Sequence, residues 1–268
     1  MADNYLPFDW YATPHYYDIV FDTTTTSEGQ FLLGCYERYA AGGPATGRTL
    51  EVACGTGRLM GYLAEAGWHA DGFDQSEGML THARRRMRAH PSRLWRDDMQ
   101  TFRTADRYDL VFSLLSSFKY LLTEEQARAH LECVARALRP GGIFVLGVHT
   151  SEYGYRARTR ERWVGQREGL RVTCNLQAWP ADRSTRREAV RSRLIVEHLG
   201  KAEQTQRYET HWQFRTYDEH ELSATLGAAP NLDLVATHGF DHNLEHTHSL
   251  LYGDRLDHVL VLRRATES

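Results

Sequence analysis

The sequence predicts an α/β fold with a mostly parallel sheet, helices on both of its faces, and a small inserted antiparallel sheet. Segments typical of strands and of helices alternate between residues 46 and 152, which is the pattern of a parallel sheet built from strand–helix units. The segment 109–115 is mainly apolar, as in a strand that is buried on both faces. From residue 170 onward, apolar residues instead recur with a period of two, which favours antiparallel strands.

Each element of the parallel sheet follows from local sequence. We expect strands at 48–53, 69–73, 109–115 and 143–148, and helices at 58–66, 76–90 and 123–138. Gly67 can end the first helix in a left-handed conformation, and Ser76 can cap the start of the second. Thr123 begins the third helix with the sequence of a capping box. The turn at 139–142, which contains proline and glycine, leads into the next strand.

After residue 149 the pattern changes. Period-two alternation predicts about three strands, at 170–179, 187–199 and 206–215. A helical pattern then returns at 218–226. Two final strands are expected near 232–238 and 257–263.

The N-terminal residues are expected to form a helical cap. Four apolar residues recur at spacings that place them on one helix face: Phe31, Leu32, Cys35 and Tyr36. We therefore divide the chain into a cap over 1–45, a core over 46–152 and 216–265, and an inserted antiparallel β subdomain over 153–215.

The composition limits the classes of partner. The 268 residues carry a net charge of -3 and 41% hydrophobic side chains, so a globular core can form and no overall positive field is available to hold nucleic acid. No segment approaches the ~18 apolar residues of a membrane span, and no basic segment followed by an apolar run opens the sequence. The four cysteines are scattered, without a metal-binding spacing. We therefore expect a cytoplasmic protein with reduced thiols, and no nucleic acid, membrane or metal as partner.

The segment 51–57, with the sequence Glu-Val-Ala-Cys-Gly-Thr-Gly, joins a predicted strand to a predicted helix. Gly55 and Gly57 allow a tight turn and the close approach of a ligand, and the helix that follows offers free backbone N–H groups. A dinucleotide-binding turn would have a third glycine where Met60 stands. Glu51 would repel a phosphate and could receive a cation. The loop therefore favours a ligand with a positively charged end over a dinucleotide.

Carboxylates also occur farther along the predicted row of strand ends. Asp74 follows the strand at 69–73, where it is placed to accept hydrogen bonds from both hydroxyls of a ribose. An adenine ring would then lie near Asp98 and Met99. Asp98 is also consistent with an ordinary surface acid, and Cys54 with packing of the loop.

The residues between 46 and 150 resemble the class I S-adenosylmethionine-dependent methyltransferases. The resemblance rests on Glu-x-Ala-Cys-Gly-Thr-Gly-Arg from Glu51, Gly-x-Asp-x-Ser-x-x-Met-Leu from Gly72, Arg-Asp-Asp-Met from Arg96, and the turn at 138–142. It implies a Rossmann-like, seven-stranded sheet and S-adenosyl-L-methionine as the cofactor. The cofactor-binding residues that it implies are Tyr17, Glu51, Ala53, Cys54, Gly55, Gly57, Asp74, Gln75, Met79, Asp98, Met99 and Leu114.

The methyl acceptor is expected beyond the C-terminal ends of the strands. Three histidines are candidate catalytic residues: His149 directly after a strand, His211 in the inserted sheet, and His246 in the polar loop 241–248. His149 is also consistent with a structural hydrogen bond, and the loop with substrate contacts, a metal or simple solvation. The aromatic residues of the inserted sheet either close over the acceptor or form a packed sheet face.

Together these features predict S-adenosylmethionine-dependent transfer of a methyl group to an amine or hydroxyl of a small molecule by in-line displacement. The resemblance leaves a homodimer open. The strand end at 113–116 lacks the Asn/Asp-Pro-Pro-Tyr/Phe motif of enzymes that methylate nucleobase amines. Two alternatives remain: a nicotinamide-dependent oxidoreductase, and a protein that binds S-adenosylmethionine without turnover.

Overall fold

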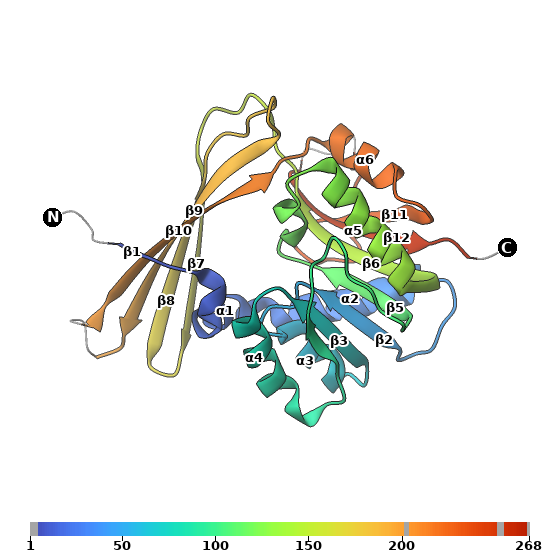
Figure 1. Cartoon of the computed structure of the whole chain (residues 1–268), viewed down its shortest axis with the longest axis horizontal. Coiled ribbons are helices and arrows are strands. Elements are labelled where there is room, and N and C mark those ends of the chain that lie inside the picture. The colour runs from blue at the N-terminus through green and yellow to red at the C-terminus, as the bar shows by residue number, and fades with distance from the viewer. Residues whose placement is uncertain (1–4, 201–203, 251–254, 267–268) are drawn as a thin grey trace.

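The computed structural model describes residues 5–200, 204–250 and 255–266, whose strands form two sheets (Figure 1). The larger sheet has seven strands: β2 (Arg48–Val52), β3 (His69–Asp74), β4 (Leu94–Arg96), β5 (Tyr108–Ser113), β6 (Leu138–His149), β11 (Leu232–His238) and β12 (Asp257–Arg264). Their order is β11-β12-β6-β5-β2-β3-β4. The neighbouring strands β6, β5, β2, β3 and β4 pair in parallel, whereas β12 is antiparallel to β6 and to β11. The predicted seven-stranded, mostly parallel sheet is therefore confirmed.

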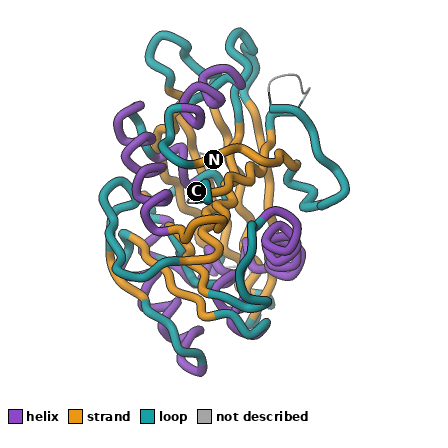
Figure 2. Tube along the Cα trace, turned by 90° about the vertical axis from the view of Figure 1, so that its right-hand side faces the viewer, coloured by secondary structure: helices purple, strands orange, loops and turns teal. Residues whose placement is uncertain are grey.

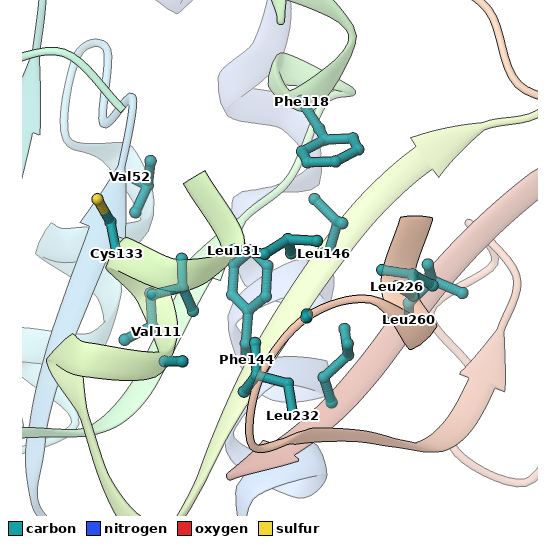
Figure 3. Close-up of a cluster of buried hydrophobic side chains, with 14 of the residues drawn as sticks. Val52, Val111, Phe118, Leu131, Cys133, Phe144, Leu146, Leu226, Leu232 and Leu260 are labelled. Atoms are coloured by element: carbon teal, nitrogen blue, oxygen red, sulfur yellow. The ribbon is translucent and has the colours of Figure 1, made fainter. Parts of the chain in front are cut away.

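Helices cover both faces of this sheet (Figure 2). On one face lie α2 (Thr25–Tyr39) and α3 (Arg58–Glu65); on the other lie α5 (Glu124–Ala137) and α6 (Glu219–Gly227). The strands are apolar toward both layers: Ile143 and Val145 of β6 pack with α2 and α3, and Phe144 and Leu146 pack with α5 and α6. Figure 3 shows the second of these cores, with Phe144 and Leu146 beside Leu131 of α5. Successive side chains of a strand thus point to opposite faces of the sheet but are apolar on both, as expected for a sheet buried on both sides.

The second sheet has five strands in the order β1-β10-β9-β8-β7. They are β1 (Leu6–Pro7), β7 (Thr159–Arg167), β8 (Leu170–Ala178), β9 (Arg187–His198) and β10 (Gln206–Arg215). The expectation of about three strands was too low. Most of β7 is polar or charged, so no apolar alternation marks it, and the two residues of β1 are too short for any pattern. β1 also comes from the N-terminal segment and pairs in parallel with β10.

The N-terminal segment continues from β1 through a short turn of 3-10 helix, η1 (Trp10–Ala12), into α1 (Pro14–Phe21). α1 packs on β7 and β8 of the second sheet and also contacts α4 (Glu77–Arg86) of the core. The contact with β7 is close because Gly165 has no side chain: a Cβ there would lie 1.9 Å from the carbonyl oxygen of Ile19. The N-terminal segment therefore lies between the second sheet and the core.

Two strands of the first sheet differ from expectation. β4 was not predicted, because three residues carry too little pattern. β6 begins at Leu138 instead of residue 143, since the segment expected as a turn remains paired with β5 through a register shift between Tyr108 and Leu110. Gly141 accommodates this irregularity in a left-handed conformation, with φ of +77°. No helix in the described part of the chain is long and apolar enough to cross a membrane.

Candidate active site

A cavity of about 1300 Å³ lies between the first sheet and the inner face of the second. Its floor comes from the loops that follow β2, β3 and β5, and from His149 at the end of β6. Its roof comes from β7, β8, β9 and β10, and the N-terminal segment closes one side. Ligands of open parallel sheets bind at this end of the strands. The site is therefore built from all three parts of the chain.

The loop after β2 turns through three left-handed residues. Ala53, Gly55 and Gly57 have φ of 56°, 53° and 68°, and only glycine takes such values without cost. Gly57 precedes α3, and a Cβ on it would lie 3.1 Å from Ala83 of α4. Gly55 faces the cavity instead: the nearest atom to a Cβ there belongs to Tyr17, at 3.8 Å. Gly55 thus leaves room for a ligand against the backbone, with Tyr17 above it.

Asp74 joins this loop to the end of β3. Its carboxylate accepts a hydrogen bond from the Gly55 backbone N–H at 2.9 Å and another from the Ser76 N–H at 2.8 Å. Burial raises the pKa of Asp74, and these backbone hydrogen bonds oppose the rise. The two oxygens together have about four lone pairs, so the carboxylate keeps acceptor capacity. Asp74 can therefore hold the loop and still accept hydrogen bonds from a ligand in the cavity.

Glu51 is buried behind the loop, with 8% of its surface exposed. Its Oε2 has no hydrogen-bond partner among the described residues. Burial raises the pKa of Glu51 to about 8, although Arg58 acts in the opposite direction. Arg58 is itself paired with Glu28 at 2.5 Å. Glu51 is thus a carboxyl group that lacks a positive partner of its own.

Most of the residues predicted to bind the cofactor line the cavity: Tyr17, Ala53, Gly55, Asp74, Gln75, Met79, Asp98, Met99 and Leu114. Three do not. Glu51 and Cys54 are buried beneath the loop, and Gly57 begins α3. Cys54 lies against Gly72 of β3, which matches the expectation that it packs the loop.

The three candidate catalytic histidines have different environments. His149 lines the cavity, and its Nδ1 lies 2.5 Å from Oδ1 of Asp257. His211 is exposed and pairs with Glu209 at 2.8 Å. Trp212 and Phe214 of the same strand line the cavity. Because successive residues of a strand point to opposite faces, His211 lies on the outer face. His246 is also exposed, beside Asp241. The structure does not bring His211 or His246 to the cavity.

Several charged and polar cavity residues were not singled out from the sequence. Buried Lys119 and partly buried Glu188 form an ion pair of 2.7 Å between the core and the roof. The hydroxyls of Tyr11 and Tyr120 are hydrogen-bonded across the cavity. Glu161 faces it from β7. Alternation along a correctly predicted β7 and β9 would have indicated both glutamates.

Comparison with known proteins identifies the class. Residues 49–142 match a family model described as a methyltransferase domain. A dTDP-3-amino-3,4,6-trideoxy-alpha-D-glucopyranose N,N-dimethyltransferase of Streptomyces venezuelae is 37% identical over 103 residues, which are 38% of this chain and 43% of that protein. The chain therefore spans less than half the length of this curated relative.

Solved structures resemble nearly the whole chain. An S-adenosylmethionine-dependent methyltransferase from Clostridium acetobutylicum has a TM-score of 0.72 at 16% identity, over 94% of this chain and 97% of that one. An amino pentose methyltransferase from Micromonospora echinaspora, solved with S-adenosylmethionine bound, has a TM-score of 0.67 at 20% identity, over 98% and 99%. Residues 49–142 are thus a methyltransferase domain, and the chain as a whole has the fold of the class I S-adenosylmethionine-dependent methyltransferases. The methyltransferase domain and the fold that the sequence predicts are therefore confirmed.

Proposed function

We propose that this chain transfers the methyl group of S-adenosylmethionine to the amino group of a small molecule, with an amino sugar as the favoured acceptor. The observation that carries the proposal is that the glycine loop and the aromatic roof line one cavity of about 1300 Å³. Ligand sites are commonly 300–1,000 Å³. A cofactor at the loop therefore leaves space beneath the roof for a second molecule.

The residues around the loop fit the cofactor. Asp74 has lone pairs for ribose hydroxyls, and Asp98 lies farther along the same wall for the adenine amino group. Oε2 of Glu51, which is buried behind the loop without a hydrogen-bond partner among the described residues, is the acceptor that we assign to the ammonium at the methionyl end. The cofactor supplies a methyl group that is already activated on a sulfonium. The protein then has to align the acceptor and exclude water, which is the work we assign to Tyr17 and the roof.

Three features favour an amine of a sugar as the acceptor. The roof presents Trp163, Trp179 and Trp212, whose flat faces can pack against the C–H edges of a sugar ring. Glu161 in the same roof attracts an ammonium group. The relatives that are named as amino sugar or amino pentose methyltransferases support the same class.

The remaining expectations follow from this function. A small-molecule substrate agrees with the net charge of -3, which gives no general attraction for nucleic acid. The four cysteines are free and buried, which agrees with a reducing compartment such as the cytoplasm. A homodimer is tested directly by light scattering of the purified protein.

The acceptor class is tested by turnover. The purified protein is incubated with S-adenosylmethionine and a dTDP-linked 3-amino sugar, its 3-hydroxy counterpart, a phenol or a carboxylic acid. We expect S-adenosylhomocysteine and a singly or doubly methylated product with the amino sugar alone. Methylation of the 3-hydroxy sugar in preference to the amine would contradict the proposed acceptor.

The cofactor is tested by calorimetry, independently of the acceptor. We expect S-adenosylmethionine to bind and NAD not to bind. Tight binding of NAD alone would favour the oxidoreductase, whereas S-adenosylmethionine binding without turnover on any acceptor would favour a binding protein.

A further inference from the structure

The roof of the cavity contains two carboxylates in an otherwise mainly apolar and aromatic surface. Alternate residues of four strands face inward: Thr159, Glu161, Trp163, Cys174, Leu176, Ala178, Glu188, Val190, Trp212 and Phe214. Glu188 is neutralised by Lys119 at 2.7 Å; the Lys119 side chain is buried, and that of Glu188 is 13% exposed. The side chain of Glu161 has no hydrogen bond or ion pair with any other described residue.

The other charged groups around Glu161 are already paired with one another. The titratable groups that face it are His149, Lys119, Glu188, Asp257 and Cys174. His149 contacts Asp257 at 2.5 Å, and Lys119 contacts Glu188. The pairing leaves Glu161 as the carboxylate without a partner in this part of the cavity. A positively charged ligand could form an ion pair with Glu161.

Aromatic side chains connect the glycine loop to the strand that carries Glu161. Tyr17 stands over Gly55, and the ring of Tyr17 packs on Phe21 at 4.6 Å between centroids. Phe21 in turn packs on Trp163 at 5.8 Å. Glu161 is the next residue of β7 on the face of Trp163. A chain of ring contacts therefore links the loop to the part of the roof that holds Glu161.

We propose that Glu161 binds the ammonium group of the methyl acceptor and accepts its proton, which makes it a catalytic residue. The inference rests on the proposed function, because it requires an amine acceptor. An ammonium nitrogen has no lone pair and cannot attack carbon. When a proton passes from this nitrogen to the Glu161 carboxylate, the freed lone pair forms the new N–C bond as the sulfonium S–C bond breaks. A neutral thioether leaves, and the methylated nitrogen carries the positive charge.

The surroundings of Glu161 suit a proton acceptor. Partial burial raises the pKa of Glu161, and the negative charges of Asp257 and Glu188 act in the same direction. His149 and Lys119 act in the opposite direction. A carboxylate with a raised pKa is a stronger base than one in water. Its pKa is closer to that of the ammonium group, so the proton transfer is less unfavourable. The proton can then leave to water through the open mouth of the cavity before a second methylation.

The first test compares Glu161→Gln and Glu161→Asp with the wild type on a dTDP-linked 3-amino sugar. For the wild type, kcat/KM is expected to rise as Glu161 ionises and to fall as the free amine loses its proton. Glu161→Gln should lower kcat/KM at pH 7 by roughly 10²-fold. The loss should shrink at high pH, where the acceptor arrives neutral. Glu161→Asp should recover part of the activity.

The second test measures binding without turnover. The same amino sugar is titrated calorimetrically into the protein with S-adenosylhomocysteine present, in two buffers of different ionisation enthalpy. Near the pKa of Glu161, the wild type should release a proton on binding, and Glu161→Gln should not. The variant should also bind the amine about 10-fold more weakly, because a charge-assisted hydrogen bond is lost.

The control variant is Glu197→Gln, which removes a carboxylate from the outer face of β9, where Glu197 lies 3.9 Å from Arg171. It should behave as the wild type in both tests. An unchanged pH profile in Glu161→Gln, or an equal loss at every pH, would overturn the role of Glu161 and leave the proposed function in place. No methylation of any amine by the wild type would overturn both.

Discussion

Among single residues, Glu51 has a charge state that depends strongly on its surroundings. Burial raises its pKa from the ordinary value of 4.5 to about 8. Between these two values the folded chain holds a proton that the unfolded chain has lost. The free energy of unfolding therefore falls as the pH rises through this window, by up to about 1.4 kcal/mol per pH unit.

The substitution Glu51→Gln should remove this dependence. Thermal unfolding of the variant is expected to change less between pH 4.5 and about 8 than that of the wild type. Glu37→Gln, on the exposed side of α2, provides the matched control and should keep the wild-type slope. Identical slopes in all three proteins would show that Glu51 does not carry the effect.

A second substitution tests the wall of the cofactor site. Asp74→Ala removes the acceptor of the Gly55 N–H and the lone pairs assigned to the ribose. We expect weaker binding of S-adenosylmethionine by roughly 1–3 kcal/mol, measured by calorimetry. Asp233→Ala, on the exposed surface of β11, should leave the affinity unchanged. Wild-type affinity in Asp74→Ala would show that the ribose binds elsewhere.

The sequence indicated the floor of the cavity better than its roof. Asp74 ends a strand that the sequence predicts, so its position at a strand end could be inferred, and the Arg-Asp-Asp-Met motif from Arg96 marks Asp98. His211 was misplaced because a one-residue change of phase turns a side chain to the opposite face of a strand. Glu161 was missed because the strand that carries it has no apolar alternation.

At the scale of elements, the ion pairs of Asp18 hold α1 in place. This residue is fully buried and lies 2.9 Å from Arg86 of α4 and 2.7 Å from Arg167 of β7. Burial alone would raise the pKa of Asp18, but hydrogen bonds from His82, Arg86 and Arg167 hold it well below its usual value. One carboxylate thus ties the helix that carries Tyr17 to both the core and the roof.

Replacing Asp18 with asparagine should loosen all three elements. We expect a loss of about 3 kcal/mol in the free energy of unfolding, since a buried carboxylate is removed from two partly exposed arginines. The depressed pKa means that the wild type keeps this stabilisation above pH 3.8 and loses it as the pH falls below that value. Urea denaturation at neutral and acidic pH measures both effects. The difference between the two proteins should narrow in acid, and a constant difference would contradict the assignment.

Elements with strong local patterns were predictable, and the others were not. The strand 109–115 and the helix begun by Thr123 were expected within a few residues of where β5 and α5 lie. β1, β4 and β7 were not expected, because pairing with distant partners creates them. β1 pairs with β10, about two hundred residues away, as Leu6 meets Tyr208. No local pattern records such a contact.

At the scale of the whole molecule, ion pairs join the roof to the core. Lys119 pairs with Glu188 at 2.7 Å, and Arg215 pairs with Glu124 at 2.7 Å. Lys119 and Arg215 are almost fully buried. Their desolvation makes each pair a weak source of net stability but makes a broken pair costly. The two sheets are therefore held in one relative position.

A double-mutant cycle tests this coupling. Lys119→Met alone should lower the free energy of unfolding by about 3 kcal/mol, because Glu188 is left largely buried without a partner. The double variant Lys119→Met with Glu188→Leu should recover most of that loss. Urea denaturation of the wild type, both single variants and the double variant gives the interaction energy. Additive losses would show that the pair does not couple the sheets.

The place of β12 has a consequence for synthesis. β12 lies inside the seven-stranded sheet, between β6 and β11, although it follows every other strand of that sheet in the sequence. On the ribosome, the glycine loop and the whole roof emerge before β12 does. Until then the edge of β6 is open along the apolar segment 143–148, and His149 lacks Asp257. A nascent chain paused before residue 257 therefore presents an unpaired strand edge, the kind of surface that chaperones shield and that other chains can join.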